Sequence, residues 1–404
     1  MKRKTIGLIA SAILVGGSLS PASAAPGANA DYIVVFKNGV SSSASASALA
    51  RIGATPAMIF ASVFNGAVIN VSAAQARQME LDPNVLSIEK DGLVQASGTQ
   101  APVPSWGLDR IDQTTATLNG NYIYPESKGE GVTIYIVDTG IATIADFGTR
   151  LLAGCSVFPA SGESKKSATT CALNVKTGSK TVSRSTIDDN GHGTHVSGTT
   201  AGTNYGVAKS ANLVPVKVLD SRGSGSTAGV VAGLDWVRAQ YVSGTRVVVN
   251  MSLGGGISNA LDTAVANLVS AGVTVVVAAG NSTTNACSNS PARVPGALTV
   301  GATQNDSLDG IASYSNYGSC VDLFAPGSNI VSDSRTGTAA TMSGTSMASP
   351  HVAGVAALVL SSGYQAPSTL AATILGASST NNPVKLSAAA IAANTPNKML
   401  LIPN

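Results

Sequence analysis

Four continuous apolar runs constrain the fold of this chain more than any other feature of its sequence. They are rich in β-branched residues and occupy 132–137, 213–219, 246–252 and 273–279. Runs of this kind are typical of strands that are buried on both faces. Helical segments separate them, for example at 230–242 and 261–271. We therefore expect an α/β unit with a mostly parallel central sheet and helices on both faces.

The composition favours close packing of the backbone and gives no electrostatic sign of a charged partner. Of the 404 residues, 43 are glycine, 11% are charged and 4% are aromatic. Short side chains allow helices and strands to approach one another closely. The formal net charge is only +3, and no block of Lys or Arg follows the first residues. We therefore expect neither nucleic acid nor a membrane as a partner.

The N-terminal part of the chain differs in character from the rest. Basic residues, an apolar run at 6–15 and small residues up to Ala24 are typical of a secretory signal peptide, which we place at 1–24. The apolar run is shorter than the ~20 residues that a membrane-spanning helix needs. From 31 to 96, two helical stretches lie among several short strands, which predicts a small α+β unit. The larger α/β unit begins at about Ser97.

The four cysteines are expected to form disulfide bonds, because an exported chain meets oxidising conditions. Their spacings do not include the C-x-x-C pattern of a zinc site, and three connectivities are possible. Cys155 with Cys171 would close a polar loop of modest size. Cys287 with Cys320 would join segments on either side of a strand-like run. We favour these two pairs, with free buried thiols as the alternative.

Three motifs carry residues that could act together in nucleophilic catalysis. Asp138 follows the apolar run 132–137 and precedes a glycine. His192 lies between two glycines at a helix start, and Ser346 begins a long apolar helix. Taken alone, Asp138 and Ser346 also fit plain capping roles. The chain has only three histidines, however, and all of them lie inside the second and third motifs, which favours a functional interpretation.

A serine hydroxyl becomes a strong nucleophile when a base removes its proton, and that base needs an acid to orient it. Asp138, His192 and Ser346 supply these parts in the chain order of subtilisin, whereas chymotrypsin begins with His and the α/β-hydrolases with Ser. Asn281 follows the run 273–279. Its amide and the Ser346 N–H could stabilise an oxyanion, although an Asn that caps a turn is the alternative.

These motifs, in this order and spacing, resemble the subtilase family, and within it the group of proteinase K and aqualysin. The resemblance runs from the exported leader to the terminal segment 395–400. It implies a secreted, monomeric serine endopeptidase with a subtilisin-like fold, which hydrolyses proteins and peptides with broad specificity through an acyl-enzyme. The resemblance also implies that Asn281 is the oxyanion donor.

The same resemblance implies a precursor of three parts. Residues 25–96 are similar to a propeptide with a ferredoxin-like α+β fold, which acts as a folding chaperone and as an intramolecular inhibitor. Its end, around Gln95-Ala96, would lie in the active-site cleft and be cut by the enzyme itself. Residues 97–404 would then form the catalytic domain.

Glycine-containing stretches predict the edges on which a substrate binds, because an extended peptide can pair with their open backbone groups as an added strand. Ala279 and Gly280 are expected to border a roomy pocket for the residue before the scissile bond. Ordinary turns are the alternative for each stretch. The residues expected along the two edges are Gly223, Ser224, Gly225, Ser252, Leu253 and Gly254.

We expect no cofactor in catalysis and a structural Ca²⁺. His192 and His195 lack the i,i+4 spacing and the glutamate of a zinc-protease helix, so we expect His195 to be a core histidine. The resemblance matches the strongest calcium site of the group to Asp322 and to the carbonyls of Pro295 and Ala297. An acid with carbonyl oxygens suits a hard cation.

Two other functions fit parts of the pattern. A binding module could keep this scaffold without activity, but every expected catalytic residue is present. A lipase or esterase would have G-x-S-x-G around its nucleophile. This chain instead has Gly344-Thr345-Ser346-Met347-Ala348.

Overall fold

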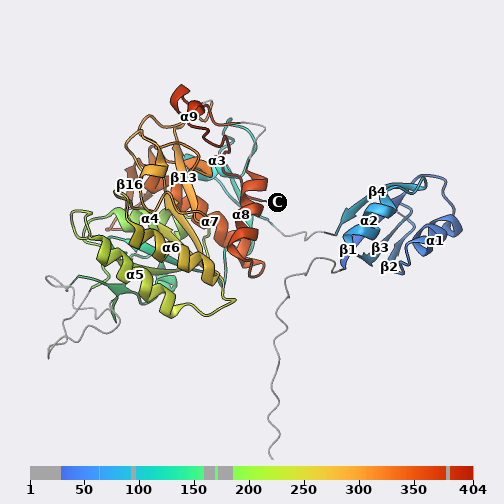
Figure 1. The fold of residues 1–404 in the computed structure, drawn as a ribbon, viewed down its shortest axis with the longest axis horizontal. Helices are drawn as coiled ribbons and strands as arrows, with labels where there is room; N and C mark the ends of the chain where they lie inside the picture. The colour runs from blue at the N-terminus through green and yellow to red at the C-terminus, as the bar shows by residue number, and fades with distance from the viewer. Residues whose placement is uncertain are drawn as a thin grey trace, which may run out of the picture. The chain divides into compact units, whose positions relative to one another are not determined.

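The chain folds into two compact units (Figure 1), the first ending at Val94 and the second beginning at Gln95. The computed structural model describes residues 29–62, 64–91, 97–158, 169–171, 185–306, 308–378 and 383–403. The expected signal peptide and the expected cleavage point at Gln95-Ala96 lie outside these residues.

The first unit is a four-stranded antiparallel sheet with two helices. Its strand order is β2-β3-β1-β4, and its βαββαβ sequence of elements is that of the ferredoxin-like fold. Each helix begins at a serine whose side chain caps the first turn, Ser41 or Ser72. The sequence pattern predicts three of the strands and misses β2. The elements are β1 (Ala30–Phe36), α1 (Ser42–Arg51), β2 (Pro56–Phe60), β3 (Gly66–Val71), α2 (Ala73–Glu80) and β4 (Val85–Lys90).

One face of this small sheet packs on its helices, and the other carries apolar side chains. Val34 and Ile69 are fully buried in the core of the unit. On the opposite face, Ile33 pairs with Val68, and Val68 pairs in turn with Met58. Met58 is 56% exposed. Within the first unit, this row of apolar residues is therefore only partly covered.

The second unit is built on an eight-stranded sheet whose described pairings are all parallel. Its strand order is β14-β13-β12-β11-β7-β10-β8-β9. The four apolar runs form β7, β10, β11 and β12, so the prediction of a parallel sheet is confirmed. The strands are β7 (Thr133–Asp138), β8 (Cys155–Ser156), β9 (Thr169–Thr170), β10 (Asn212–Lys217), β11 (Val247–Met251), β12 (Thr274–Ala278), β13 (Leu298–Thr303) and β14 (Leu323–Pro326).

Helices cover both faces of the large sheet (Figure 1). Helices α4 and α7 pack on one face, and α5 and α6 lie side by side on the other. Ile134 and Ile136 of β7 point into the first layer, whereas Tyr135 and Val137 point into the second. Because alternate side chains are buried on opposite faces, the strand is apolar throughout. The helices are α3 (Trp106–Ile111), α4 (His192–Ala201), α5 (Thr227–Gln240), α6 (Asn259–Ala271), α7 (Thr345–Ser361), α8 (Pro367–Ala377) and α9 (Ala388–Ala392).

Smaller elements complete the second unit. The strands β5 and β6 form one two-stranded sheet, and β15 and β16 form another that packs on α4. The structure also contains the favoured disulfide bonds, Cys155–Cys171 and Cys287–Cys320. The bounds are β5 (Ser97–Gln100), β6 (Tyr122–Pro125), β15 (Ile330–Asp333) and β16 (Ala339–Met342), with short 3₁₀ helices at Gly148–Arg150 and Ala286–Ser288.

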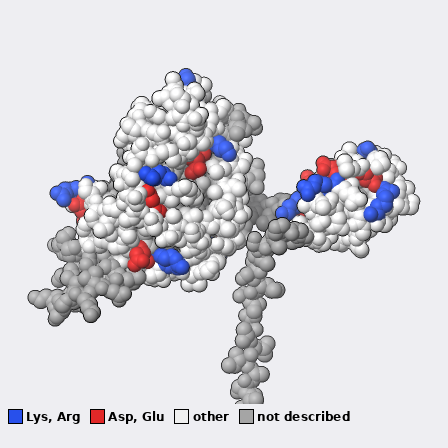
Figure 2. Space-filling view, viewed as in Figure 1, with Lys and Arg blue, Asp and Glu red and all other residues white. Residues whose placement is uncertain are grey.

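The surface carries few charges. On the face drawn in Figure 2, Lys and Arg lie in small groups near Asp and Glu, and most of the surface is uncharged. None of the helices that the structure describes combines the length and the apolar composition of a membrane span.

Candidate active site

The carboxyl edge of the parallel sheet brings together residues that are far apart in the sequence. Asp138 ends β7, Ser252 directly follows β11, and Asn281 comes shortly after β12. His192 begins α4, and Ser346 is the second residue of α7. Parallel strands all end at the same edge of a sheet, so groups that follow them collect there.

The imidazole of His192 is held by the carboxylate of Asp138. Its Nδ1 lies 2.8 Å from Oδ1 and 3.0 Å from Oδ2 of Asp138. The carboxylate is fully buried, whereas the side chain of His192 is 27% exposed. Because an ionised carboxylate can only accept, Nδ1 carries the hydrogen and Nε2 is left as the base. Asp138 and His192 thus have the contact that the sequence analysis predicts.

The surroundings of His192 have opposing effects on its pKa. Burial lowers the pKa of the imidazole, whereas the charge and hydrogen bond of Asp138 and the charge of Asp188 raise it. The net pKa lies above the ordinary value of 6.5. His192 can take a proton only when it is neutral, so a reaction that uses it as a base accelerates as the pH rises above 6.5.

A buried acid that the sequence analysis did not single out fixes the start of α4. Asp188 accepts from the hydroxyl of Thr139 at 2.8 Å, and from the backbone N and hydroxyl of Thr194 at 2.9 and 2.6 Å. The hydroxyl oxygen of Thr139 accepts in turn from the backbone N of Gly193 at 2.9 Å. These bonds tie the loop after β7 to the first turn of α4. The only signal in the sequence was an acid just before the His192 motif.

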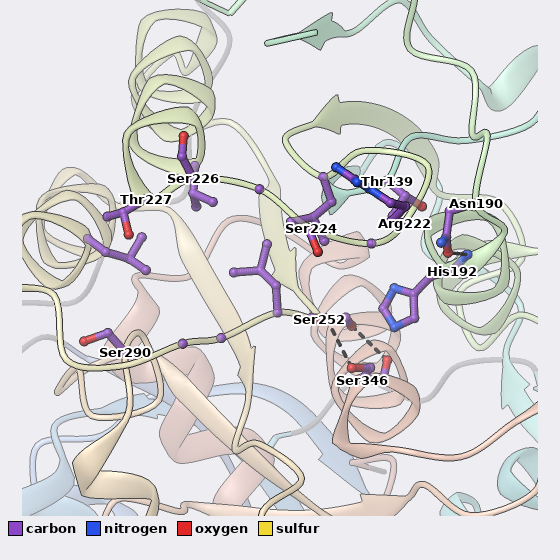
Figure 3. Close-up of a pocket in the computed structure, with 18 of the residues that line it drawn as sticks. Thr139, Asn190, His192, Arg222, Ser224, Ser226, Thr227, Ser252, Ser290 and Ser346 are labelled. Carbon is purple, nitrogen blue, oxygen red and sulfur yellow. Dashed lines mark hydrogen bonds between the residues drawn. The ribbon is translucent and has the colours of Figure 1, made fainter.

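Ser346 enters the same cleft from the start of α7. Figure 3 shows it beside the ring of His192. Its hydroxyl donates to the backbone carbonyl of Ser252 at 3.2 Å, and among the described residues no hydrogen bond joins it to His192. Catalytic hydrogen bonds are often long before substrate binds and tighten in the complex. The hydroxyl therefore has to turn from Ser252 to His192 before it can attack.

Asn281 is held by its oxygen, which leaves its amide nitrogen for the cleft. The oxygen accepts from the backbone N and the hydroxyl of Thr345 at 2.8 and 2.9 Å. The backbone N–H of Ser346 lies in the first turn of α7, where the helix supplies no acceptor. Asn281 and Ser346 line one cavity, so these two donors can serve an oxyanion between them. Thr345 holds Asn281 in place, a role that its sequence motif does not predict.

Two cavities of about 570 and 370 Å³ adjoin Ser346. The larger contains His192 and the two expected substrate edges at 223–225 and 252–254. Figure 3 draws it with Ser224 on one wall and Ser252 on the other. The smaller is lined by Ala279 and Gly280, and Leu253 and Gly254 border both cavities. The structure thus collects every expected substrate-binding residue around one cleft.

The two other histidines are core residues. The Nε2 of His195 donates to the backbone carbonyls of Ile330 and Ala340 at 3.0 and 3.2 Å. The Nδ1 of His351 donates to the carbonyl of Met347 at 2.8 Å. Burial lowers the pKa of both imidazoles to about 4. Of the three histidines, only His192 is placed to exchange a proton with a substrate.

The expected calcium ligands lie on neighbouring segments. Ala297 immediately precedes β13, and Asp322 immediately precedes the adjacent strand β14. Burial raises the pKa of Asp322 to about 6, against the lowering effects of a hydrogen bond from Thr299 and the charge of Lys398. The described residues contain no group of three or more His, Cys, Asp or Glu that could hold a metal. A cation at Asp322 would therefore depend on backbone carbonyls, which suit Ca²⁺.

A parallel α/β sheet that presents an acid, an imidazole and an alcohol at its carboxyl edge defines the class of serine hydrolases. Comparison with known proteins narrows this class. Residues 129–392 match the model of the subtilase family. The chain is 45% identical over 311 residues to the extracellular serine proteinase of Thermus sp. (strain Rt41A), which covers 76% of this chain and 69% of that protein.

Two further relatives agree with this assignment. Alkaline serine exoprotease A of Vibrio alginolyticus is 43% identical over 330 residues, which cover 80% of this chain and 57% of that protein. The crystal structure of a cold adapted subtilisin-like serine proteinase superposes with a TM-score of 0.64 at 43% identity, over 75% of this chain and 100% of that one. The chain belongs to the subtilase family, and it is a secreted serine endopeptidase.

Proposed function

We propose that Ser346 is the nucleophile of this peptidase, with His192 as its base, Asp138 as the acid that orients the base, and Asn281 as the oxyanion donor. The observation that carries this assignment is the pair of short contacts between His192 Nδ1 and Asp138, which leaves Nε2 free in the cleft that contains Ser346. The chemistry of acyl transfer requires this combination of groups.

In the first half of the reaction, the Ser346 oxygen bonds to the carbonyl carbon of the scissile peptide while its proton passes to His192 Nε2. The negative charge on the carbonyl oxygen is stabilised by the Asn281 amide and the Ser346 N–H. His192 then gives its proton to the leaving amine, and an acyl-enzyme remains. In the second half, His192 takes a proton from water as the water oxygen bonds to the acyl carbon. The bond from this carbon to the Ser346 oxygen then breaks, and His192 returns the proton to that oxygen, which releases the acid product and restores Ser346.

Replacement of the nucleophile tests the assignment. Ser346→Ala should abolish casein hydrolysis, leave the precursor uncut and prevent labelling by a phosphonylating reagent. Ser343→Ala is the matched control, because this serine lies in the same motif and its oxygen accepts from the backbone N of Asn329, away from His192. Full activity in Ser346→Ala would refute the assignment.

We also propose that substrates bind as an added strand between segments 223–225 and 252–254, with the side chain before the scissile bond in the cavity beside Ala279 and Gly280. Both walls of the larger cavity offer backbone groups, so recognition depends on the main chain more than on side chains. Cleavage of an unbiased peptide mixture should therefore be broadly tolerant. A requirement for one residue type at several positions would contradict this mode.

We propose that residues 25–96 are a propeptide that assists folding, inhibits the enzyme and is removed by self-cleavage near Gln95-Ala96, after a signal peptide at 1–24. The apolar row of Ile33, Val68 and Met58 supports this role, because an exposed apolar patch on a sheet face is typical of a site that binds another protein surface. N-terminal sequencing of the secreted enzyme should find a start close to Ser97. A mature protein that retains β1 would refute the proposal.

A structural Ca²⁺ at Asp322, with the carbonyls of Pro295 and Ala297, is a separate proposal. The partly buried carboxyl group of Asp322, which lies next to the starts of the adjacent strands β13 and β14, supports it. A chelator should lower the Tm of the parent enzyme, and Asp322→Asn should have a low Tm that the chelator no longer changes. An unchanged Tm of the parent in chelator would end this proposal.

A further inference from the structure

Pro350 interrupts the backbone hydrogen bonds of α7 at the site of catalysis. It lies inside the helix and has no N–H, so it cannot donate to the carbonyl oxygen four residues earlier, which belongs to Ser346. That oxygen instead accepts from the hydroxyl of Ser252 at 2.8 Å, a residue 94 positions away in the sequence. The carbonyl of Ser346 is therefore bound from outside its own helix.

Two further buried side chains extend this contact into a relay. The amide nitrogen of Asn250 donates to the hydroxyl oxygen of Ser252 at 2.9 Å, and the hydroxyl of Ser349 donates to the amide oxygen of Asn250 at 2.6 Å. Asn250 and Ser349 are fully buried. The direction of every bond is fixed, because the carbonyl of Ser346 can only accept and the amide nitrogen can only donate.

The relay begins and ends on α7. It leaves the helix at Ser349, crosses the carboxyl end of β11 through Asn250 and Ser252, and returns to Ser346, one turn before its start. Ser252 also accepts from the hydroxyl of Ser346 through its own carbonyl, so it contacts this residue twice, as the dashed lines in Figure 3 show. The first turn of α7 is thereby bound to β11 at both the backbone and the side chain of Ser346.

We propose that Asn250 and Ser349 are positioning residues for Ser346 and that they act through the hydroxyl of Ser252. The inference rests on the proposed role of Ser346 as nucleophile. Neither Asn250 nor Ser349 lines the two cavities beside Ser346, so neither contacts substrate there. Loss of one bond leaves a buried polar group unpaired and frees the first turn of α7 to shift. A displacement of a reacting group by about 1 Å costs about 10²-fold in rate.

Two substitutions break the relay in different ways. Ser349→Ala removes its first donor, and Asn250→Asp keeps the shape of the side chain but replaces the donor to Ser252 with an acceptor. We expect either change to lower kcat by about 10- to 100-fold, with KM within about two-fold of the parent. The rate of phosphonylation of Ser346 should fall in proportion. Ser349→Thr keeps the hydroxyl group, so this variant should keep most of the parent kcat.

Ser378→Ala is the matched control. Ser378 is also buried, and its hydroxyl also donates one bond, to the carbonyl of Ile374 at 2.7 Å, but it lies outside the relay. The Ser378→Ala variant should have a lower Tm than the parent enzyme and should keep the parent kcat. If Asn250→Asp does not fold, Ser349→Ala alone decides the question.

Two results would overturn the proposal. One is a Ser349→Ala enzyme whose kcat stays within about two-fold of the parent while its Tm falls as in Ser378→Ala, which is the mark of a purely structural role. The other is a rise in KM at unchanged kcat, which would make this serine a determinant of binding. Activity in Ser346→Ala is a distinct outcome, because it would refute the assignment of the nucleophile itself.

Discussion

Carboxyl groups lie at both ends of helix α4, and the two ends differ in the hydrogen-bond donors that they provide. At the N-terminal end, Asp138 accepts from His192 and from the backbone N of Thr139. At the C-terminal end, Asp146 and Asp333 approach each other, and Oδ2 of Asp333 is buried with no hydrogen-bond donor among the described residues. Hydrogen bonds thus hold the carboxyl group of Asp138 at one end, whereas burial raises the pKa of the Asp333 carboxyl group at the other.

The helix itself contributes to this difference. Its N-terminal end carries partial positive charge and favours carboxylates, whereas its C-terminal end disfavours them. Both acids lie close to Gly202, which caps the C-terminal end of α4. A Cβ atom added to this glycine would lie 2.5 Å from Oδ2 of Asp146 and 3.0 Å from Oδ2 of Asp333. Burial raises the pKa of Asp333, and the nearby charge of Asp146 raises it further. The charge of Asp146 also interacts with Arg150 and Lys209, where it raises their pKa values against the lowering effect of burial.

The largest expected effect comes from removing the charge at the N-terminal end. Asp138→Asn should lower kcat by about 10⁴-fold, because the amide no longer holds His192 in the tautomer that has a free Nε2. Asp333→Asn is the control at the other end and should leave kcat within about two-fold of the parent. Equal losses of kcat in the two variants would erase the distinction between the ends.

The pH dependence of the parent enzyme is the second test. Below the raised pKa of His192, kcat/KM should fall about tenfold for each pH unit, since only neutral His192 is a base. The midpoint of this rise should lie above 6.5. A midpoint below 6.5 would mean that burial outweighs the effect of Asp138 on the imidazole.

A smaller effect is expected at Asp188, which acts on His192 through its charge and through the first turn of α4. Asp188→Asn should lower kcat by about five- to tenfold and move the rise in kcat/KM to lower pH, because a charge that raises the pKa of His192 is gone. The pH profile of the purified variant checks this. A shift to higher pH would contradict the electrostatic role of Asp188.

The smallest effect concerns stability at the C-terminal end. The pKa of Asp333 is raised in the folded enzyme, so between 3.8 and that pKa the unfolded chain binds fewer protons. Stability from this group is therefore complete below 3.8 and is lost as the pH rises through the folded pKa. Asp333→Asn should raise the Tm at alkaline pH by about 2–4 °C relative to the parent.

Exposed Asp235 supplies the control for this measurement. Asp235→Asn should leave the dependence of Tm on pH unchanged. If the Tm of the parent does not fall relative to that of Asp333→Asn as the pH rises from 3.8 through the folded pKa of Asp333, the pKa of this group is not raised in the folded enzyme.

Sequence reasoning reached the parallel sheet and the expected active-site residues because both leave local signals. A strand buried on both faces is apolar at every position, and Asp138, His192 and Ser346 each lie in a short glycine-containing motif. It missed β2, whose pattern PAMIF does not alternate and whose central residues are exposed. It also missed Asp188 and Thr345, whose positions in the sequence have the pattern of ordinary caps.

The sequence by itself determined the class of fold, the order of the chemical groups and the family to which the chain is related, because these depend on local pattern and residue type. Only the tertiary structure decided which groups are bound to one another. Asn250 and Ser349 lie 99 residues apart and meet between β11 and α7, while Asp146 and Asp333 meet beside Gly202. A hydrogen bond or an interaction between two carboxyl groups depends on distance in space, and this distance is set by the packing of the whole sheet and its helices.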